Sequence, residues 1–453
     1  MRFTIPGAAV ALALAALTAG CGTPGGSSGD TAQKTDQEAK QTVAKTDVAK
    51  AGKVTLTVWD QEVRGGQNAQ MKRLNAAFQQ KYPNVTIKRV AKSFTDLNTT
   101  LKLAVSSANA PDVVEANQGR PIMGQLVKAG LLRPVDPYAR AYGWQNRYSS
   151  VLLDLNKFSS DGKTFGAGNL YGLSQMGEIV GVFYNKDKVK QFPQTMSDFV
   201  AQVKQAKAQG DVPIQFGNLD KFGGIHEYET ALSRIADKQA VRDFVFARQG
   251  ASFDNPDFVK AATQLQDWAK AGYFTPNFNG VGYDPAWQQF AKGKGRFLIA
   301  GTWVTADLAK QMGDRIGFAL MPGASASDQP VALGGESLPF TITSKSKHPD
   351  VAAAYIDFIT NPDAAKVLAE TNNLPAMPVD PSAVPSTGLS ADVFAQWKKL
   401  NAADGLIPYL DYTTPTFYDD ISGGVQRLMA AKDTPAQFAK NMQSVYDKWN
   451  SSR

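Results

Sequence analysis

The chain has 453 residues, of which 43% are hydrophobic and 20% charged, and its formal net charge is +7. These proportions are typical of a globular protein and exclude a largely disordered chain. A single cysteine excludes a disulfide framework, and two histidines give a zinc site little to build from. Lysine and arginine are scattered among acidic residues, which argues against a nucleic-acid partner, because such partners select a clustered basic face.

Residues 1–20 have the layout of a secretory signal, with Arg2 followed by an apolar run from Ile5 to Ala19. The run is too short for a membrane span, which needs about 20 apolar residues. Its end, LTAGC, resembles a bacterial lipobox, although Thr18 stands where leucine is usual. The resemblance implies cleavage before Cys21 and lipidation of that cysteine, with the mature protein held on the outer face of the cytoplasmic membrane by its lipid alone. An ordinary signal peptide with an incidental cysteine is the alternative.

Residues 21–52 carry the expected lipidated cysteine and then a run of small and polar residues without aromatic side chains. Such a segment buries too little apolar surface to offset the entropy lost on ordering. We therefore expect a flexible tether between the anchor and the body of the protein.

From Lys53 onward, strand and helix patterns alternate. Alternating apolar residues predict a strand at 54–58, and helical spacing at 71–78 predicts a helix that ends before Pro83. A second strand at 85–87 precedes a helix that Ser93 and Asp96 can cap. A buried parallel strand is predicted at 112–114. This order indicates an α/β fold.

The second half of the chain begins with a long extended segment at 171–185. Helices are predicted after Thr195 and around 258–268, and a second buried strand at 297–300. The sequence Thr434-Pro435-Ala436-Gln437 predicts a helix start with a capping box.

Several motifs occur in an order that is more specific than these patterns. They are Val54–Asp60, Phe78–Pro83, Ala110–Glu115, Tyr171–Asn185, Phe290–Gly295, Ala300–Trp303, Gly334–Ser337 and Ala352–Pro375. This series resembles the extracellular solute-binding proteins of family 1, the sugar-binding lipoproteins of ABC importers and relatives of maltodextrin-binding protein. The resemblance extends from Val54 to Trp449.

The resemblance implies a two-lobed fold of the periplasmic-binding-protein type (type II), with two α/β lobes joined by a multi-strand hinge. It assigns residues 53–176 and 298–332 to one lobe, and residues 182–294 and 338–453 to the other. Extended segments near 171–185 and 331–342 suit strands that cross between lobes. The implied function is capture of an oligosaccharide by hinge closure and its delivery to the permease subunits of an ABC importer, by a monomer without catalysis or cofactor.

A sugar presents hydroxyls that must be paired when buried and apolar faces that suit aromatic rings. The resemblance places a sugar-stacking tryptophan at Trp303, a ligand-binding carboxylate at Glu178 and a further aromatic residue at Tyr418. We also expect Glu336, within the Gly334–Ser337 motif, to contact the ligand. The alternatives are a packing role for Trp303 and a hinge salt bridge for Glu178.

Loops beyond the carboxyl ends of strands face the crevice in open α/β sheets. Candidate contacts therefore follow the first strand, the third strand and the apolar run Ile214–Phe216. They are Asp60, Gln61 and Glu62, then Glu115, Asn117 and Gln118, and finally Asn218. Solvated loops are the alternative for each set.

The sequence gives weaker support to two enzymatic functions. A secreted glycoside hydrolase needs two carboxylates at a set separation, and pairs such as Asp60/Glu62 weigh little. A serine hydrolase lacks support because the Gly172–Met176 segment misses the final glycine of a nucleophile elbow. The same fold with a metal, polyamine or osmolyte cargo stays open, as does a lipoprotein that only signals or acts as a scaffold.

Overall fold

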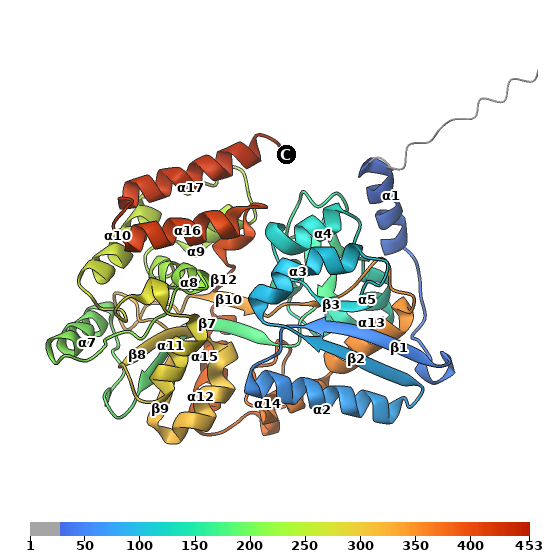
Figure 1. Ribbon diagram of the computed structural model, residues 1–453, viewed down its shortest axis with the longest axis horizontal. Helices are drawn as coiled ribbons and strands as arrows, with labels where there is room; N and C mark the ends of the chain where they lie inside the picture. Colours follow the sequence, from blue (N-terminus) through green and yellow to red (C-terminus); the bar gives the residue numbers. More distant parts are fainter. Residues whose placement is uncertain (1–27) are drawn as a thin grey trace, which may run out of the picture.

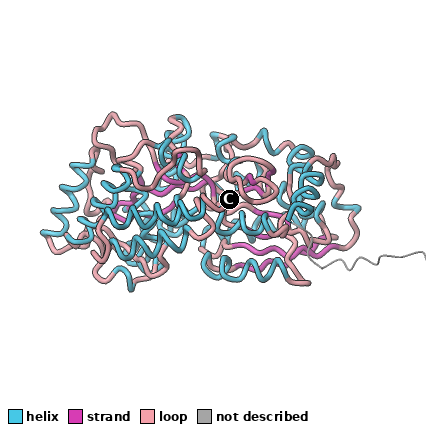
Figure 2. The backbone as a smooth tube through the Cα atoms, turned by 90° about the horizontal axis from the view of Figure 1, so that it is seen from above, coloured by secondary structure: helices cyan, strands magenta, loops and turns pink. Residues whose placement is uncertain are grey.

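The structure, a computed structural model, describes residues 28–453. The signal peptide and the lipidation of Cys21 predicted from the sequence lie outside these residues. No helix in the described part of the chain has the length and apolar character needed to cross a membrane. The elements form two lobes, which lie side by side in both views (Figures 1 and 2).

The first lobe is built on a five-stranded sheet of order β2-β1-β3-β11-β6. Its strands are β1 (Val54–Asp60), β2 (Val85–Ala91), β3 (Val113–Glu115), β6 (Gly172–Leu173) and β11 (Phe340–Ile342). The helices around it are α2 (Gly65–Lys81), α3 (Phe94–Ser106), α4 (Gln125–Lys128), α5 (Asp136–Tyr142), α6 (Ser150–Asp154), α13 (Pro349–Ile359) and α14 (Pro362–Glu370), beside the small hairpin β4 (Lys157–Phe158) and β5 (Asn169–Leu170). Strand β1 pairs in parallel with β2 and β3, so their carboxyl ends share one edge of the sheet.

The second lobe contains a sheet of order β12-β10-β7-β8, with β9 also paired to β7. Its strands are β7 (Gly177–Asn185), β8 (Phe297–Gly301), β9 (Ile316–Ala319), β10 (Ala332–Glu336) and β12 (Leu406–Ile407). Its helices are α7 (Met196–Ala208), α8 (Phe222–Leu232), α9 (Lys238–Val245), α10 (Pro256–Lys270), α11 (Tyr283–Ala291), α12 (Thr305–Met312), α15 (Gly388–Ala402), α16 (Phe417–Met429) and α17 (Pro435–Asn450). Figure 1 shows these helices grouped around β7–β10, apart from the strands of the first lobe.

The chain crosses between lobes from β6 to β7, from β10 to β11 and between α14 and α15. The first two crossings fall in the extended segments 171–185 and 331–342, as predicted. The predicted assignment of later residues to lobes is wrong. Strands β8 and β9, within 298–332, pair with β7 of the second lobe. Strand β11, within 338–453, pairs with β3 and β6 of the first lobe. The lobe to which a strand belongs is therefore decided by its hydrogen-bonded partners, which the order of strands along the chain does not reveal.

The flexible tether predicted for residues 21–52 is also contradicted for the part that the structure describes. Residues Ser28–Ala39 form helix α1, and Val48–Lys50 form a short 3-10 helix. Val48 is 1% exposed and packs in the core of the first lobe. The Asn84 side chain donates to the Val48 carbonyl at 2.8 Å, and the Thr46 amide donates to the Tyr142 hydroxyl at 3.0 Å. The surface that orders this segment is supplied by residues distant in sequence, which composition does not reveal.

Local signals placed the helix ends well. The Ser93 hydroxyl accepts from the Asp96 amide at 3.1 Å at the start of α3, as predicted. The capping box of Thr434 and Gln437 starts α17, with the Thr434 amide donating to the Gln437 side chain at 2.9 Å. These caps satisfy backbone donors that the first turn of a helix leaves unpaired.

Candidate functional site: the cavity between the lobes

A cavity lies between the two lobes. Both lobes and the crossing strands supply its wall. The lining residues are Gln61, Arg64, Phe94, Asn117, Glu178, Phe222, Ile225, His226, Trp303, Leu338, Tyr409, Asp411, Tyr412 and Tyr418. Small-molecule sites are typically lined by apolar and aromatic side chains with a few convergent polar groups, and this lining has that composition.

The first lobe contributes mainly polar side chains from the carboxyl ends of its parallel strands. Gln61 and Arg64 follow β1, and Asn117 follows β3. The Gln61 amide donates to the Glu115 carboxylate at 2.6 Å, which fixes the backbone of that turn. The sheet edge thus presents hydrogen-bonding groups to the cavity, as the strand order predicted.

The second lobe contributes an aromatic wall. Trp303 follows β8, and its Nε1 donates to the Tyr283 hydroxyl at 3.0 Å. The His226 ring lies between two others, with its centroid 5.4 Å from Trp303 and 5.5 Å from Tyr409. Tyr409 in turn meets Tyr412 edge-on at 5.5 Å.

The tryptophan ring folds back over the end of its own strand. A Cβ at Gly301 would lie 2.0 Å from the Trp303 ring, so a side chain there would displace the indole. Glycine at this position is therefore required for the orientation of Trp303 at the cavity wall.

Aromatic contacts also bridge the two lobes at the cavity. Phe94, at the start of α3, lies 5.8 Å from Phe222 and 6.4 Å from Tyr418, both in the second lobe. These distances are within the range of favourable ring pairs. The contacts between the two lobes therefore include apolar ring pairs as well as polar interactions.

Buried carboxylates give the cavity unusual electrostatics. Burial, together with the nearby carboxylates of Glu62 and Asp411, raises the pKa of Glu178 to about 8. Burial raises the pKa of Asp411 to about 7. Burial lowers the pKa of His226 to about 3, so its imidazole is neutral at physiological pH.

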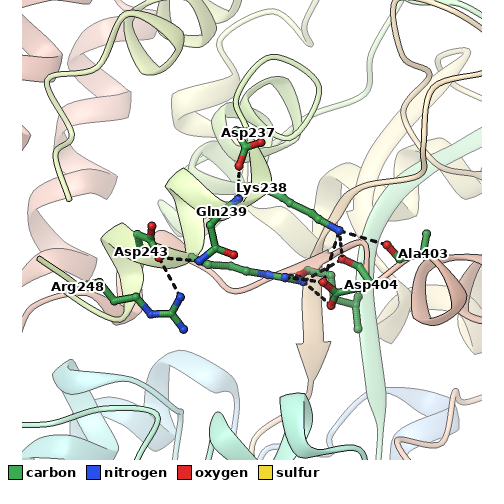
Figure 3. A network of polar contacts seen from close by, with 9 residues as sticks. Asp237, Lys238, Gln239, Asp243, Arg248, Ala403 and Asp404 are labelled. Carbon is green, nitrogen blue, oxygen red and sulfur yellow. Dashed lines mark hydrogen bonds and ion pairs between the residues drawn. The ribbon is translucent and has the colours of Figure 1, made fainter. Parts of the chain in front are cut away.

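A polar network on the second lobe holds the segment that leads to Tyr409 (Figure 3). Lys238, at the start of α9, donates to the Ala403 and Asp404 carbonyls at 3.2 and 2.7 Å. Arg242, one turn later, pairs with the Asp404 carboxylate at 2.8 Å and donates to the Leu406 carbonyl at 2.6 Å. The segment before β12 is thereby tied to α9, which positions the residues that follow β12.

Of the residues predicted as ligand contacts, Trp303, Glu178, Asn117 and Tyr418 line the cavity, and so does Gln61. The structure brings them together from five separate parts of the sequence. Glu178 is 8% exposed and forms no ion pair among the described residues, so the structure does not support the alternative hinge salt bridge.

Asp60, Glu62 and Glu115 lie behind the wall instead of in it. Asp60 is fully buried and pairs with Arg89 at 2.6 Å. Glu62 and Glu115 are each 1% exposed, and burial raises the pKa of Glu62 to about 7. These carboxylates support the turn that presents Gln61, because Glu115 accepts from the Gln61 amide at 2.6 Å and Asp60 accepts from the Glu62 amide at 3.0 Å.

Gln118, Asn218 and Glu336 are likewise absent from the cavity wall. Gln118 donates to the Ser337 carbonyl at 2.8 Å and links the third strand to a crossing segment. Asn218 accepts from the Gly224 amide at 2.8 Å and supports the first turn of α8. Glu336, 1% exposed, accepts from the Asn156 side chain. Their polar groups stabilise the scaffold around the site.

Sequence reasoning missed several lining residues. Tyr409, Asp411 and Tyr412 form a cluster of aromatic and acidic side chains after an apolar pair, which is a pattern that could have identified them. Phe222 and His226 are four residues apart on α8 and therefore share a face. Arg64, Phe94, Ile225 and Leu338 carry no such signal. Among the described residues, no group of three or more histidine, cysteine, aspartate or glutamate side chains is arranged to hold a metal ion.

Comparison with known proteins agrees with this architecture. Residues 73–402 match the family model described as "Bacterial extracellular solute-binding protein". The chain is 23% identical over 358 residues to the multiple sugar-binding protein of Streptococcus mutans serotype c, covering 74% of this chain and 81% of that protein. It is 24% identical over 330 residues to the galactooligosaccharide-binding protein of Bacillus subtilis, covering 71% and 72%.

A solved chitin oligosaccharide binding protein has the same fold. It matches with a TM-score of 0.75 and 20% identity, covering 88% of this chain and 99% of the other. The two-lobed α/β architecture expected from the sequence is thus confirmed. Because the family model spans most of both lobes, the chain belongs to the bacterial extracellular solute-binding proteins.

Proposed function

We propose that this protein captures an oligosaccharide in the cavity between its lobes and delivers it unchanged to an ABC importer. The observation that carries the proposal is the composition of the wall, with polar side chains from the first lobe facing aromatic rings from the second. Hydroxyls of a sugar pair with the former, and its apolar faces pack against the latter. Relatives whose names describe sugar binding support the same cargo.

The lobes close on the sugar by bending at the segments between β6 and β7, between β10 and β11, and between α14 and α15. Solute-binding proteins as a class move in this way. The bridging aromatic pairs Phe94–Phe222 and Phe94–Tyr418 then stabilise the closed form.

The mature protein is a monomer, anchored by lipid at Cys21 on the outer face of the cytoplasmic membrane. The lipobox-like end of the leader supports this location, and membership of an extracellular family agrees with it. Its partners are the sugar and the permease subunits of the importer.

A thermal-melting screen over malto-, xylo-, cello- and galacto-oligosaccharides tests the cargo. A ligand present at 100 times its Kd adds about 2.7 kcal/mol to stability, so a true ligand raises the Tm. Chromatography of the recovered sugar should show it intact. A shift only with a metal ion, a polyamine or an osmolyte would replace the cargo, and cleaved sugar would make the protein an enzyme.

A further inference from the structure

Carboxylates converge on one part of the cavity. Glu178 and Asp411 line it, and Glu62 of the first lobe is close enough to Glu178 to raise its pKa. Glu229, 2% exposed, lies behind Asp411, and one of its oxygens accepts from the Leu410 amide. Four acidic side chains from both lobes and a crossing strand thus surround a small region.

Positive charge does not balance them. Arg64 is the one arginine or lysine on the cavity wall within the described residues, and it pairs with Asp284 at 2.9 Å. His226 is neutral, because burial lowers its pKa to about 3. In the part of the chain that the structure describes, neither Glu178 nor Asp411 forms an ion pair.

A second, independent feature marks the same region as a binding position. Tyr409 lines the cavity and is 5% exposed; its hydroxyl lies beside the Glu178 carboxyl, but among the described residues it forms no hydrogen bond of good geometry. Its ring belongs to the cluster with His226 and Tyr412. Buried polar groups are normally paired, so this hydroxyl faces a place that a ligand completes. Rings grouped beside carboxylates are the surroundings that stabilise an ammonium group.

We infer that the sugar taken by this cavity carries a positively charged amine, which lies against the Tyr409 ring and pairs with the carboxylates of Glu178 and Asp411. The inference rests on the proposed function, because it names the chemical class of that oligosaccharide as an amino sugar. The ammonium group of the sugar supplies the positive charge that the side chains around Glu178 and Asp411 do not provide.

Binding of such a sugar releases protons. Glu178 faces Glu62, Asp411, Tyr409 and Glu336, and none of these groups supplies positive charge. With a pKa of about 8, Glu178 is largely protonated near pH 7 in the empty protein, and Asp411, with a pKa of about 7, is about half protonated. An ammonium group favours their ionised forms, so their protons pass to the buffer as the amine binds.

Titration calorimetry at pH 7 with matched pairs of sugars tests the inference. The pairs are the β-1,4 glucosamine trimer against its N-acetylated form, and 6-amino-6-deoxymaltotriose against maltotriose. We expect at least one amine to bind about tenfold tighter than its neutral partner or more, with heats that differ between phosphate and Tris buffers because protons are released. Spermidine, which has amines but no sugar, is the third probe.

Variants locate the effect. Asp411→Asn and Glu178→Gln keep the shape of a neutral carboxyl, and each should bring the ratio of the affinities for the amine and for its neutral partner to about one. Glu370→Gln, at an exposed carboxylate outside the cavity, should keep the preference. Equal or tighter binding of the neutral partner in both pairs overturns the inference but leaves the proposed function standing. Binding of spermidine without any sugar overturns both, whereas binding of none of these probes overturns the inference and leaves the proposed function to the oligosaccharide screen.

Discussion

The guanidinium of Arg64 in the first lobe lies 2.9 Å from the carboxylate of Asp284 in the second. The next residue, Gly65, donates its amide to the Asp307 carboxylate of the second lobe at 3.1 Å. Near α4, Arg120 is 2% exposed and donates to the Thr413 carbonyl at 2.7 Å. Figure 1 places α2 and α4 on opposite sides of the first-lobe strands, so the lobes are tied together on both flanks of the cavity.

Asp284→Asn should weaken sugar binding by about two- to fivefold, since exposed or half-exposed ion pairs contribute about 0.2–1 kcal/mol. The Asp284 side chain is 46% exposed, which limits the effect to this range. The asparagine oxygen still accepts from Arg64, so the loss reports the charge that favours the closed form. Titration calorimetry measures it.

Glu370→Gln is the matched control, because the Glu370 side chain is about as exposed as that of Asp284 (52% against 46%) but its ion pair with Arg73 lies within the first lobe. It should leave affinity unchanged. An equal loss of affinity in both variants would show that the Arg64–Asp284 pair has no special part in closure.

Trp303→Ala should weaken binding about tenfold or more while the protein still folds. The variant removes a large ring from the cavity wall, and stacked aromatic residues carry a disproportionate share of binding free energy. Trp59→Ala removes a half-buried tryptophan that is not among the lining residues, and should leave affinity unchanged. Circular dichroism checks the fold of both variants. Wild-type affinity in Trp303→Ala would assign the indole to packing alone.

Glu178 should make the empty protein less stable as pH rises. Burial raises the pKa of Glu178 to about 8, above its value in the unfolded chain. The folded state therefore holds a proton that the unfolded state has lost, and the free energy of unfolding falls between about pH 4.5 and pH 8.

Glu178→Gln should flatten this part of the pH profile. At pH 8–9 it should raise both the Tm and the free energy of unfolding, the latter by an amount on the order of a few kcal/mol. Thermal melts from pH 4.5 to 9, with Glu370→Gln alongside, measure the difference. Parallel profiles for wild type and Glu178→Gln would mean that Glu178 titrates as an ordinary exposed carboxylate.

Cys21→Ser should release the protein into the medium if lipid at Cys21 is the anchor. The predicted leader is removed by cleavage, and no helix among the described residues could span a membrane. The lipid at Cys21 is then what holds the protein at the membrane. Fractionation of cells and medium, with immunoblotting, gives the readout. Unchanged retention in the membrane fraction would contradict the anchor.

Patterns local in sequence predicted the elements well, whereas relations between distant segments were out of reach. The caps at Ser93 and Thr434 depend on residues three apart, and both are confirmed. The sheet that receives β8 or β11 depends on pairing with strands more than a hundred residues away. The order of strands along the chain indicates that a sheet exists. It does not specify the lobe whose sheet each strand joins.

The site shows the same limit at finer scale. The rule that loops after parallel strands face the crevice led to the correct turn at residues 60–62. Within that turn, the salt bridge to Arg89 draws Asp60 inward, and Gln61 is left at the cavity. The side chain that faces a ligand was therefore decided by a partner on β2, which the local sequence does not specify.

Val48→Ala should destabilise the protein by about 1–2 kcal/mol, because the side chain is 1% exposed and losing two methyl groups forfeits buried apolar area. Val151→Ala, at a residue that is 45% exposed, should change stability little and serves as the control. Urea denaturation measures both, and sugar affinity should stay unchanged in each because neither residue lines the cavity. If Val48→Ala matched Val151→Ala, residues 46–50 would behave in solution as the loose tether that their composition indicates. A clear difference would mean that the segment around Val48 is part of the first lobe.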